Sequence, residues 1–80
     1  MAKITVGMSP IALPVTRGET PIIQNLGPGI LYLDTRSDVT ASTGLLVDVH
    51  SAYEWPSDVT RAVYAVADAE GTDVRVMVVG

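Results

Sequence analysis

β-branched residues dominate this chain, and glycine or proline interrupts them about every ten residues. Of the 80 residues, 12 are Val, 8 are Thr and 5 are Ile. A branched Cβ restricts χ1, so these residues fit the pleated surface of a sheet better than a helix. Short strands separated by turn residues at this spacing are typical of a sandwich or barrel. We therefore expect an all-β fold, a single small antiparallel β-sandwich over residues 1–80, with an extended N-terminal segment and a jelly roll as one candidate topology.

Two hairpins are expected from the turn residues. The first runs from Ile22 to Leu33 through Gly27-Pro28-Gly29, in which proline presets φ and the second glycine supplies a positive φ. The second joins Tyr64 to Val78 through a turn centred on Glu70-Gly71. Further strands are expected at Lys3–Val6, Ile11–Val15, Leu45–His50 and Tyr53–Trp55, and a loop with a brief strand near Val39 is expected over Asp34–Thr43.

One segment fits both a helix and a strand. Over Asp58–Asp68, apolar residues recur at helical spacing, and Ser57 is suited to an N-cap. The same segment is rich in Val, Tyr and Thr, and the turn that follows it suits a hairpin. We therefore predict a strand over Arg61–Ala67.

The size of the chain favours association with another protein. A chain of 80 residues folds to roughly 4,600 Å² of surface and buries only about 62% of what it exposes when unfolded. Small domains often add disulfides, metals or oligomerisation to their stability, and cysteine is absent here. Hydrophobic residues make up 48% of the chain and charged residues 18%. We therefore expect part of the apolar surface to be buried against a second copy or a larger partner.

The net charge and the lengths of the apolar runs exclude two classes of partner, nucleic acids and membranes. The 5 basic and 9 acidic residues give a net charge of −4, and binding to a phosphate backbone needs many Lys and Arg. No apolar run is long enough to cross a bilayer, and Gly7 and Pro10 interrupt any signal-peptide core within Met1–Val15. We expect no nucleic-acid partner, no membrane partner and synthesis in a cytoplasm.

The residues that could carry chemistry form no recognisable site. His50 is the only histidine. On a strand Ser51 would face the opposite side, and no Gly-x-Ser-x-Gly turn presents a serine to a hydrolase centred on His50. Asp34 and Asp38 flank Arg36 and do not match a loop with alternating oxygen ligands for Ca²⁺. We therefore expect no catalytic residue, no metal and no cofactor, and interpret the protein as not an enzyme.

Two groups of apolar residues are candidates for an interface. Pro10 and Pro14 lack backbone N–H donors, so the N-terminal segment Lys3–Val15, within residues 1–16, is either an edge strand of its own domain or an extended strap. As a strap, it would fill a groove or extend a sheet edge of a neighbouring molecule. The second group is aromatic and suits core packing, a subunit contact or a sugar-stacking platform. The candidate interface residues are Ile11, Leu13, Val15, Tyr53 and Trp55.

The succession of strand and turn types between Pro21 and Val79 resembles that of a family. The segments that carry it are Ile22-Ile23-Gln24-Asn25-Leu26-Gly27, Ile30-Leu31-Tyr32-Leu33, Asp38-Val39-Thr40, Thr43-Gly44-Leu45-Leu46, Ala52-Tyr53-Glu54-Trp55, Val63-Tyr64-Ala65-Val66-Ala67 and Gly71-Thr72-Asp73-Val74-Arg75-Val76. Their order is similar to that in the small β-sandwich virion proteins of tailed bacteriophages, in particular minor capsid or decoration proteins. One departure is Val47-Asp48-Val49, where a Pro-Gly turn would be expected.

The resemblance implies a non-enzymatic protein of the virion. It implies binding to the outside of an assembled capsid, with the major capsid protein as partner, and stabilisation of the shell by a symmetric oligomer. A homotrimer is the stoichiometry that it favours. The alternative is a small carbohydrate-binding or adaptor module of a phage tail or fibre, in which Trp55 and the tyrosines would contact the ligand.

Overall fold

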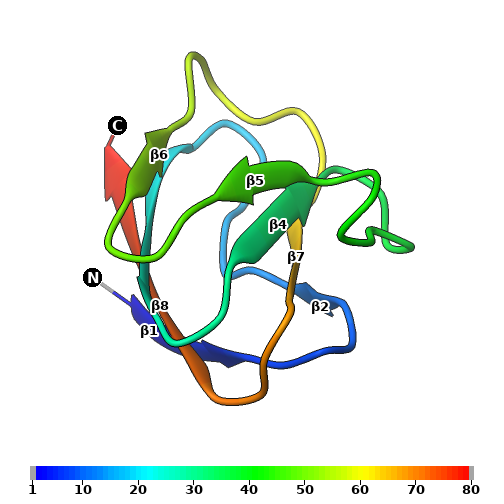
Figure 1. Ribbon diagram of the computed structural model, residues 1–80. Helices are drawn as coiled ribbons and strands as arrows, with labels where there is room; N and C mark the ends of the chain where they lie inside the picture. The colour runs from blue at the N-terminus through cyan, green and yellow to red at the C-terminus, as the bar shows by residue number, and fades with distance from the viewer. Residues whose placement is uncertain (1, 80) are drawn as a thin grey trace.

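Residues 2–79 form strands and connecting loops, without a helix (Figure 1). The computed structural model describes residues 2–79, so Met1 and Gly80, the ends of the predicted domain, lie outside the described residues. The strands are β1 (Ala2–Val6), β2 (Ile11–Ala12), β3 (Thr20–Gly27), β4 (Leu31–Asp34), β5 (Leu45–Val47), β6 (Ala52–Glu54), β7 (Tyr64–Ala67) and β8 (Thr72–Val79). In residues 2–79 there is no helix long and apolar enough to cross a membrane.

The strands form two four-stranded antiparallel sheets. Sheet A has the order β1-β8-β3-β6 and sheet B the order β2-β7-β4-β5; in Figure 1 sheet A lies at the left and sheet B at the centre and right. The pairs β1–β8, β2–β7, β3–β6 and β4–β5 are nested, so the two halves of the chain run beside each other like one long hairpin that has been rolled up. This is a jelly roll. The predicted antiparallel sandwich is confirmed.

Both predicted hairpins are wrong. β3 and β4 lie in different sheets, and so do β7 and β8, so residues 28–30 and 68–71 cross from one sheet to the other. Within residues 2–79 the only consecutive strands that pair are β4 and β5. Stacked sheets lie only about 10 Å apart, so a short connection rich in glycine and proline suits a crossing as well as a reversal. The turns were placed correctly, but the strands they join pair with others.

The glycines of the first crossing have different roles from those predicted. The positive φ falls on Gly27, at 86°, rather than on Gly29. Gly29 is required for close approach instead, because a Cβ there would lie 2.7 Å from the Thr72 Oγ1. In the second crossing Gly71 has φ 72°, which agrees with the predicted turn centre.

Several strands are shorter than predicted. β5 ends at Val47, and the chain then turns through His50, whose φ of 65° is unusual for a residue with a Cβ. The predicted helix alternative over residues 58–68 is not found, and β7 starts only at Tyr64. No strand forms at Val39, which is instead buried beneath the loop that contains it.

Two buried polar residues tie the first crossing to its surroundings. The Asn25 Nδ2 donates to the carbonyl oxygens of Gly29 and Val47, both at 2.9 Å, and its Oδ1 accepts from the Gly27 N–H at 2.8 Å. The Thr72 hydroxyl accepts from the Gly29 N–H and donates to the Ala69 carbonyl. Because the Val47 carbonyl belongs to sheet B, Asn25 links the two sheets through hydrogen bonds as well as through packing.

The core lies between the sheets and is aliphatic. Its members are drawn from both sheets and from the connections at either end. They are Val6, Leu13, Val15, Ile23, Leu31, Leu33, Val47, Val59, Val63, Ala65, Ala67, Val74 and Val76.

Candidate functional site

Tyr53 and Trp55 lie together where the sandwich is open. Tyr53 is opposite Ile23, a fully buried residue, so its side chain points to the inner side of sheet A. Trp55 follows on the same side, and the two rings form an edge-to-face pair with centroids 5.5 Å apart and an angle of 86° between planes. Both rings are half-buried and pack against the core. Because β5 and β6 are edges of different sheets, no strand of residues 2–79 closes the sandwich in front of the rings.

The opening forms a groove of about 430 Å³ between β5 and β6. Leu33 and Leu45 line it from sheet B, opposite the two aromatic rings. Asp34, Thr35 and Thr43 add a carboxylate and two hydroxyls. An apolar floor with a few polar groups on one wall is the usual composition of a ligand site of this size. The groove can therefore accept a ligand that combines a flat apolar face with hydroxyl groups.

The N-terminal candidates are placed in the interior of their own domain. Leu13 is 4% exposed and Val15 8%, and both belong to the core. Ile11 lies on β2 opposite Ala65, and the Leu13 N–H donates to the Val63 carbonyl at 2.8 Å. β2 is an edge strand of sheet B. The segment therefore adopts the edge-strand arrangement, and a strap would require Leu13 and Val15 to leave the core.

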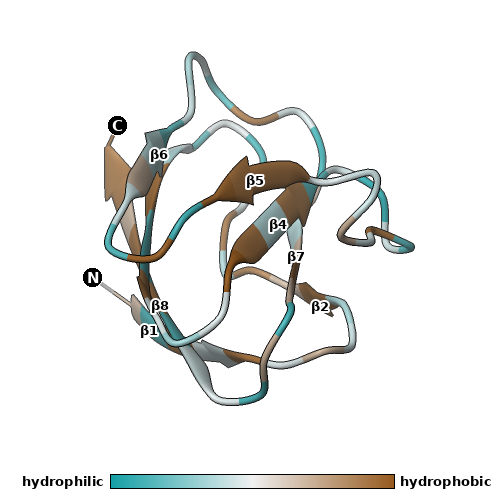
Figure 2. Ribbon diagram, in the orientation of Figure 1, coloured by the Kyte–Doolittle hydropathy of each residue, from teal (hydrophilic) through white to brown (hydrophobic). Residues whose placement is uncertain are grey.

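Other apolar side chains are more exposed than the predicted candidates. The total surface of 4453 Å² is close to the roughly 4,600 Å² expected for a domain of this length, so the exposure concerns particular residues. Figure 2 shows the apolar character of β5 and of the end of β8. The signal was present in the sequence, since two consecutive apolar residues on a strand must face opposite sides. The exposed residues are Met8, Leu45, Leu46, Met77, Val78 and Val79.

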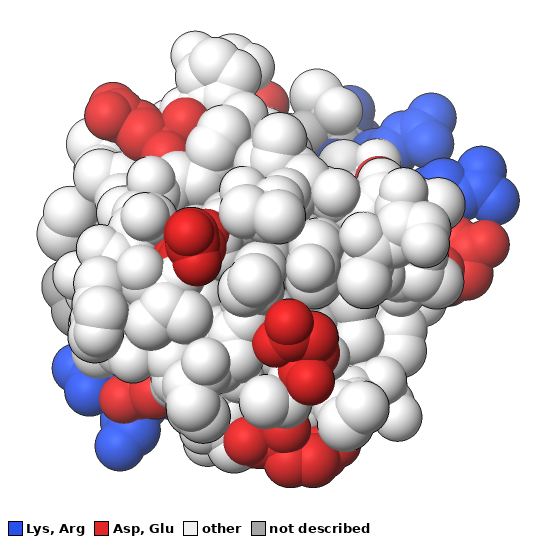
Figure 3. Space-filling view, viewed as in Figure 1, with Lys and Arg blue, Asp and Glu red and all other residues white. Residues whose placement is uncertain are grey.

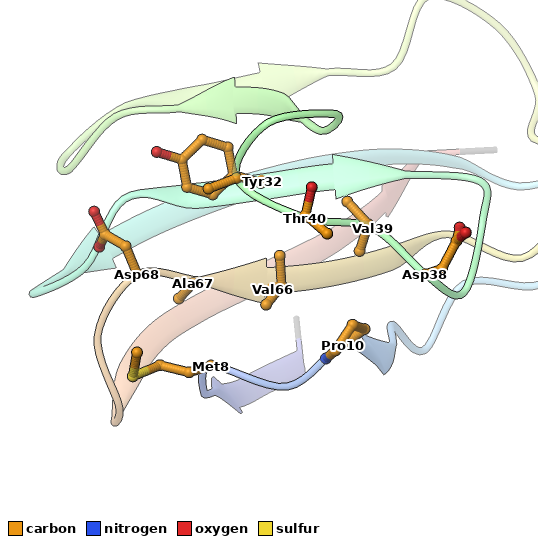
Figure 4. Close-up of a pocket in the computed structure, with 10 residues that line it drawn as sticks. Met8, Pro10, Tyr32, Asp38, Val39, Thr40, Val66, Ala67 and Asp68 are labelled. Carbon is orange, nitrogen blue, oxygen red and sulfur yellow. The ribbon is translucent and has the colours of Figure 1, made fainter.

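A second hollow of about 400 Å³ lies on the outer face of sheet B (Figure 4). Tyr32, Val39 and Val66 surround it, with Asp38 and Asp68 at its two ends. Both carboxylates already have partners within the chain. Arg36 donates to Asp38 at 3.2 Å and holds the pKa of that carboxyl below its usual value, and the Ile30 N–H donates to Asp68 at 2.7 Å. A ligand in this hollow would therefore contact mainly apolar side chains, since both carboxylates already accept hydrogen bonds from the chain itself.

The polar residues considered for catalysis are not assembled. His50 is exposed in the turn after β5, and its backbone N–H donates to the Asn25 carbonyl at 2.7 Å. The Asp48 carboxylate accepts from the next backbone N–H rather than from the imidazole. Within residues 2–79 no three His, Asp or Glu side chains are grouped to hold a metal.

Comparison of the chain with known protein families, with curated proteins and with solved structures finds no match. Function is therefore inferred from the geometry of this chain and from the order of its strand and turn types.

Proposed function

We propose that the protein is a non-enzymatic structural protein of a phage virion that binds the outside of the capsid, as the sequence resemblance implies. The observation that carries the proposal is the exposed apolar surface over sheet B. Leu46 is opposite Tyr32, and both point to the outer side because the neighbouring residues of β4 are buried. Leu46 is 56% exposed and Met8, beside the hollow, 60%.

The distribution of charge supports a protein partner for this face. Figure 3 shows a mostly uncharged surface over the strands of sheet B, with separated acidic side chains and basic ones only at the margins. The centre of a protein interface is typically depleted of charge and surrounded by a polar rim. Burying one exposed leucine contributes about 1.5–3 kcal/mol, and an ordered shell repeats each contact many times.

The test is co-sedimentation of the purified chain with expanded capsids of its parent phage that lack it. We expect saturable binding of the wild-type chain. Leu46→Glu should bind the capsid at least about tenfold more weakly, because the substitution places a charge at the centre of the contact. Thr60→Glu is the control, since it adds the same charge in the exposed connection between β6 and β7. Failure of the wild-type chain to bind, or equal binding by both variants, would contradict the proposal.

A carbohydrate-binding module of a tail or fibre is the second candidate. The groove beside Tyr53 and Trp55 favours it, since aromatic rings next to a carboxylate and hydroxyls suit a sugar ring. Trp55 is the only tryptophan, so its fluorescence reports directly on the groove. Titration with a panel of bacterial glycans should shift the Trp55 emission of the wild-type protein, and the shift should be lost in Tyr53→Ala. If no glycan changes the emission of the wild-type protein, this candidate is eliminated.

A further inference from the structure

The outer face of sheet A has an apolar centre. Met77 of β8 is opposite Ile22 of β3, and both point outward because their neighbours Ile23 and Val76 are in the core. Val79 points to the same side, two residues further along β8, and Met77 and Val79 are 40% and 50% exposed. Long apolar side chains in the middle of a sheet face remain in water unless another surface covers them.

Opposite charges flank this centre on the two edge strands. Lys3 of β1 is opposite Arg75, so it lies on the same outer face as Met77. Glu54 of β6 is opposite Ile22, on the other side of the apolar centre. Both are exposed, and neither forms an ion pair within residues 2–79. Arg75, by contrast, donates from its Nε to the Asp73 Oδ1 at 3.0 Å and from its Nη2 to the Asp73 Oδ2 at 3.1 Å.

The spacing of these residues makes the face complementary to itself. β1 and β6 are the two edges of a four-stranded sheet, so Lys3 and Glu54 are separated by about 14 Å across the strands, at about 4.8 Å per strand. Along the strands they differ by one same-side step, about 7 Å, which the long lysine side chain can span. A rotation of 180° about an axis running along the strands exchanges the two edges. It therefore places a lysine over a glutamate twice, with apolar side chains between the two pairs.

We propose that the outer face of sheet A binds the same face of a second copy of this chain about a two-fold axis. Met77, Ile22 and Val79 form the centre of the contact. Lys3 lies opposite Glu54 of the partner subunit, and the equivalent pair forms by symmetry. The proposal does not depend on the proposed function, and its two-fold symmetry differs from the homotrimer that the sequence resemblance favours. It uses a different face from the one proposed to bind the capsid.

The test uses the isolated chain, so it can fail independently of capsid binding. Sedimentation velocity of the wild-type protein should show a reversible dimer. Lys3→Glu and Glu54→Lys should each weaken it about tenfold or more, because each single variant opposes two pairs of like charges. A 1:1 mixture of the two variants should recover dimer, since the mixed pair restores both attractions. That recovery also shows that neither variant was simply misfolded.

Two controls separate the contact from general effects of charge and fold. Arg36→Glu changes the net charge as Lys3→Glu does, but in the exposed loop over sheet B, and should leave the dimer unchanged. Met77→Glu should abolish dimer formation alone and in mixtures. A monomeric wild-type protein, a trimer, unaffected single variants or a mixture that stays monomeric would each overturn the proposal.

Discussion

Replacing Asn25 by alanine should destabilise the protein more than any other single change to a polar side chain in β3. The side chain is fully buried, and three hydrogen bonds join it to Gly27, Gly29 and Val47. Each such bond contributes about 0.5–1.5 kcal/mol net, and a buried group left without a partner costs about 1–3 kcal/mol. The substitution leaves two carbonyl oxygens and one N–H without the hydrogen bonds that Asn25 forms with them. We therefore expect the free energy of unfolding to fall by about 3–4 kcal/mol.

This loss is large relative to the stability of so short a chain. A domain of 80 residues unfolds with about 4–12 kcal/mol. The melting temperature should fall by about 12–32 °C, at about 4–8 °C per kcal/mol. In urea the midpoint should fall by roughly 1.5–4 M, for a slope of about 1–2 kcal/mol per M. Trp55 fluorescence follows unfolding in both assays.

Gln24→Ala is the matched control. Gln24 is the preceding residue of the same strand and points to the outer face, where it is only half-buried. Surface substitutions of this kind usually change stability by less than about 0.5 kcal/mol. If Asn25→Ala were as stable as Gln24→Ala to within that margin, the role assigned to the hydrogen bonds between the sheets would be refuted.

Three further predictions follow from other parts of the fold. Gly29→Ala should cost about 1–3 kcal/mol, because its Cβ would press into the neighbouring turn, and an unchanged urea midpoint would contradict this. Gly71→Ala meets no atom within 4 Å and should cost roughly 1–2 kcal/mol for its left-handed φ alone. Leu13→Ala should destabilise the isolated chain by about 2–5 kcal/mol, while a side chain that serves a neighbouring molecule would leave the isolated chain unaffected. The hydrogen bonds from Arg75, and more weakly the charge of Lys3, hold the pKa of Asp73 below its usual value of 3.8, so the stability from this carboxylate is fully present above pH 3.8 and is lost as the pH falls through its lower folded value. Thermal melts from pH 6 to pH 2 should therefore show a smaller acid-induced loss for Asp73→Asn, and equal losses would show that the pair contributes nothing.

Local patterns in the sequence were sufficient for the fold class. The β-branched composition predicts strands, and the strands over residues 20–27 and 72–79 alternate between buried and more exposed residues along most of their length. The positions of glycine and proline locate the connections. None of these signals specifies which strands pair, because pairing in a jelly roll joins segments far apart in sequence. For this reason the local sequence predicts a hairpin between Tyr64 and Val78, although their strands lie in different sheets.

The candidate site was predicted in part. Tyr53 and Trp55 lie on the same side of the chain, as their alternate spacing predicts, and the structure places a groove beside them. Leu13 and Val15 show the same alternation, but they are buried in the core. Alternation alone does not distinguish a core residue from an interface residue, because both kinds are apolar. Leu46 and Met77 could be recognised only after the partner strands were known, since these partners decide which side of the sheet is covered.

The nested pairing also determines when the fold can be completed during synthesis. Ala2 pairs with Val76, and Ile11 with Ala65, so the early strands have no neighbour until the late ones have left the ribosome. β4 and β5 are the first strands that can pair as the chain is synthesised, because they are consecutive in the sequence. Topologies dominated by such distant contacts fold in milliseconds to seconds. For that interval the aliphatic strands are unprotected, which makes the nascent chain a natural client for chaperones.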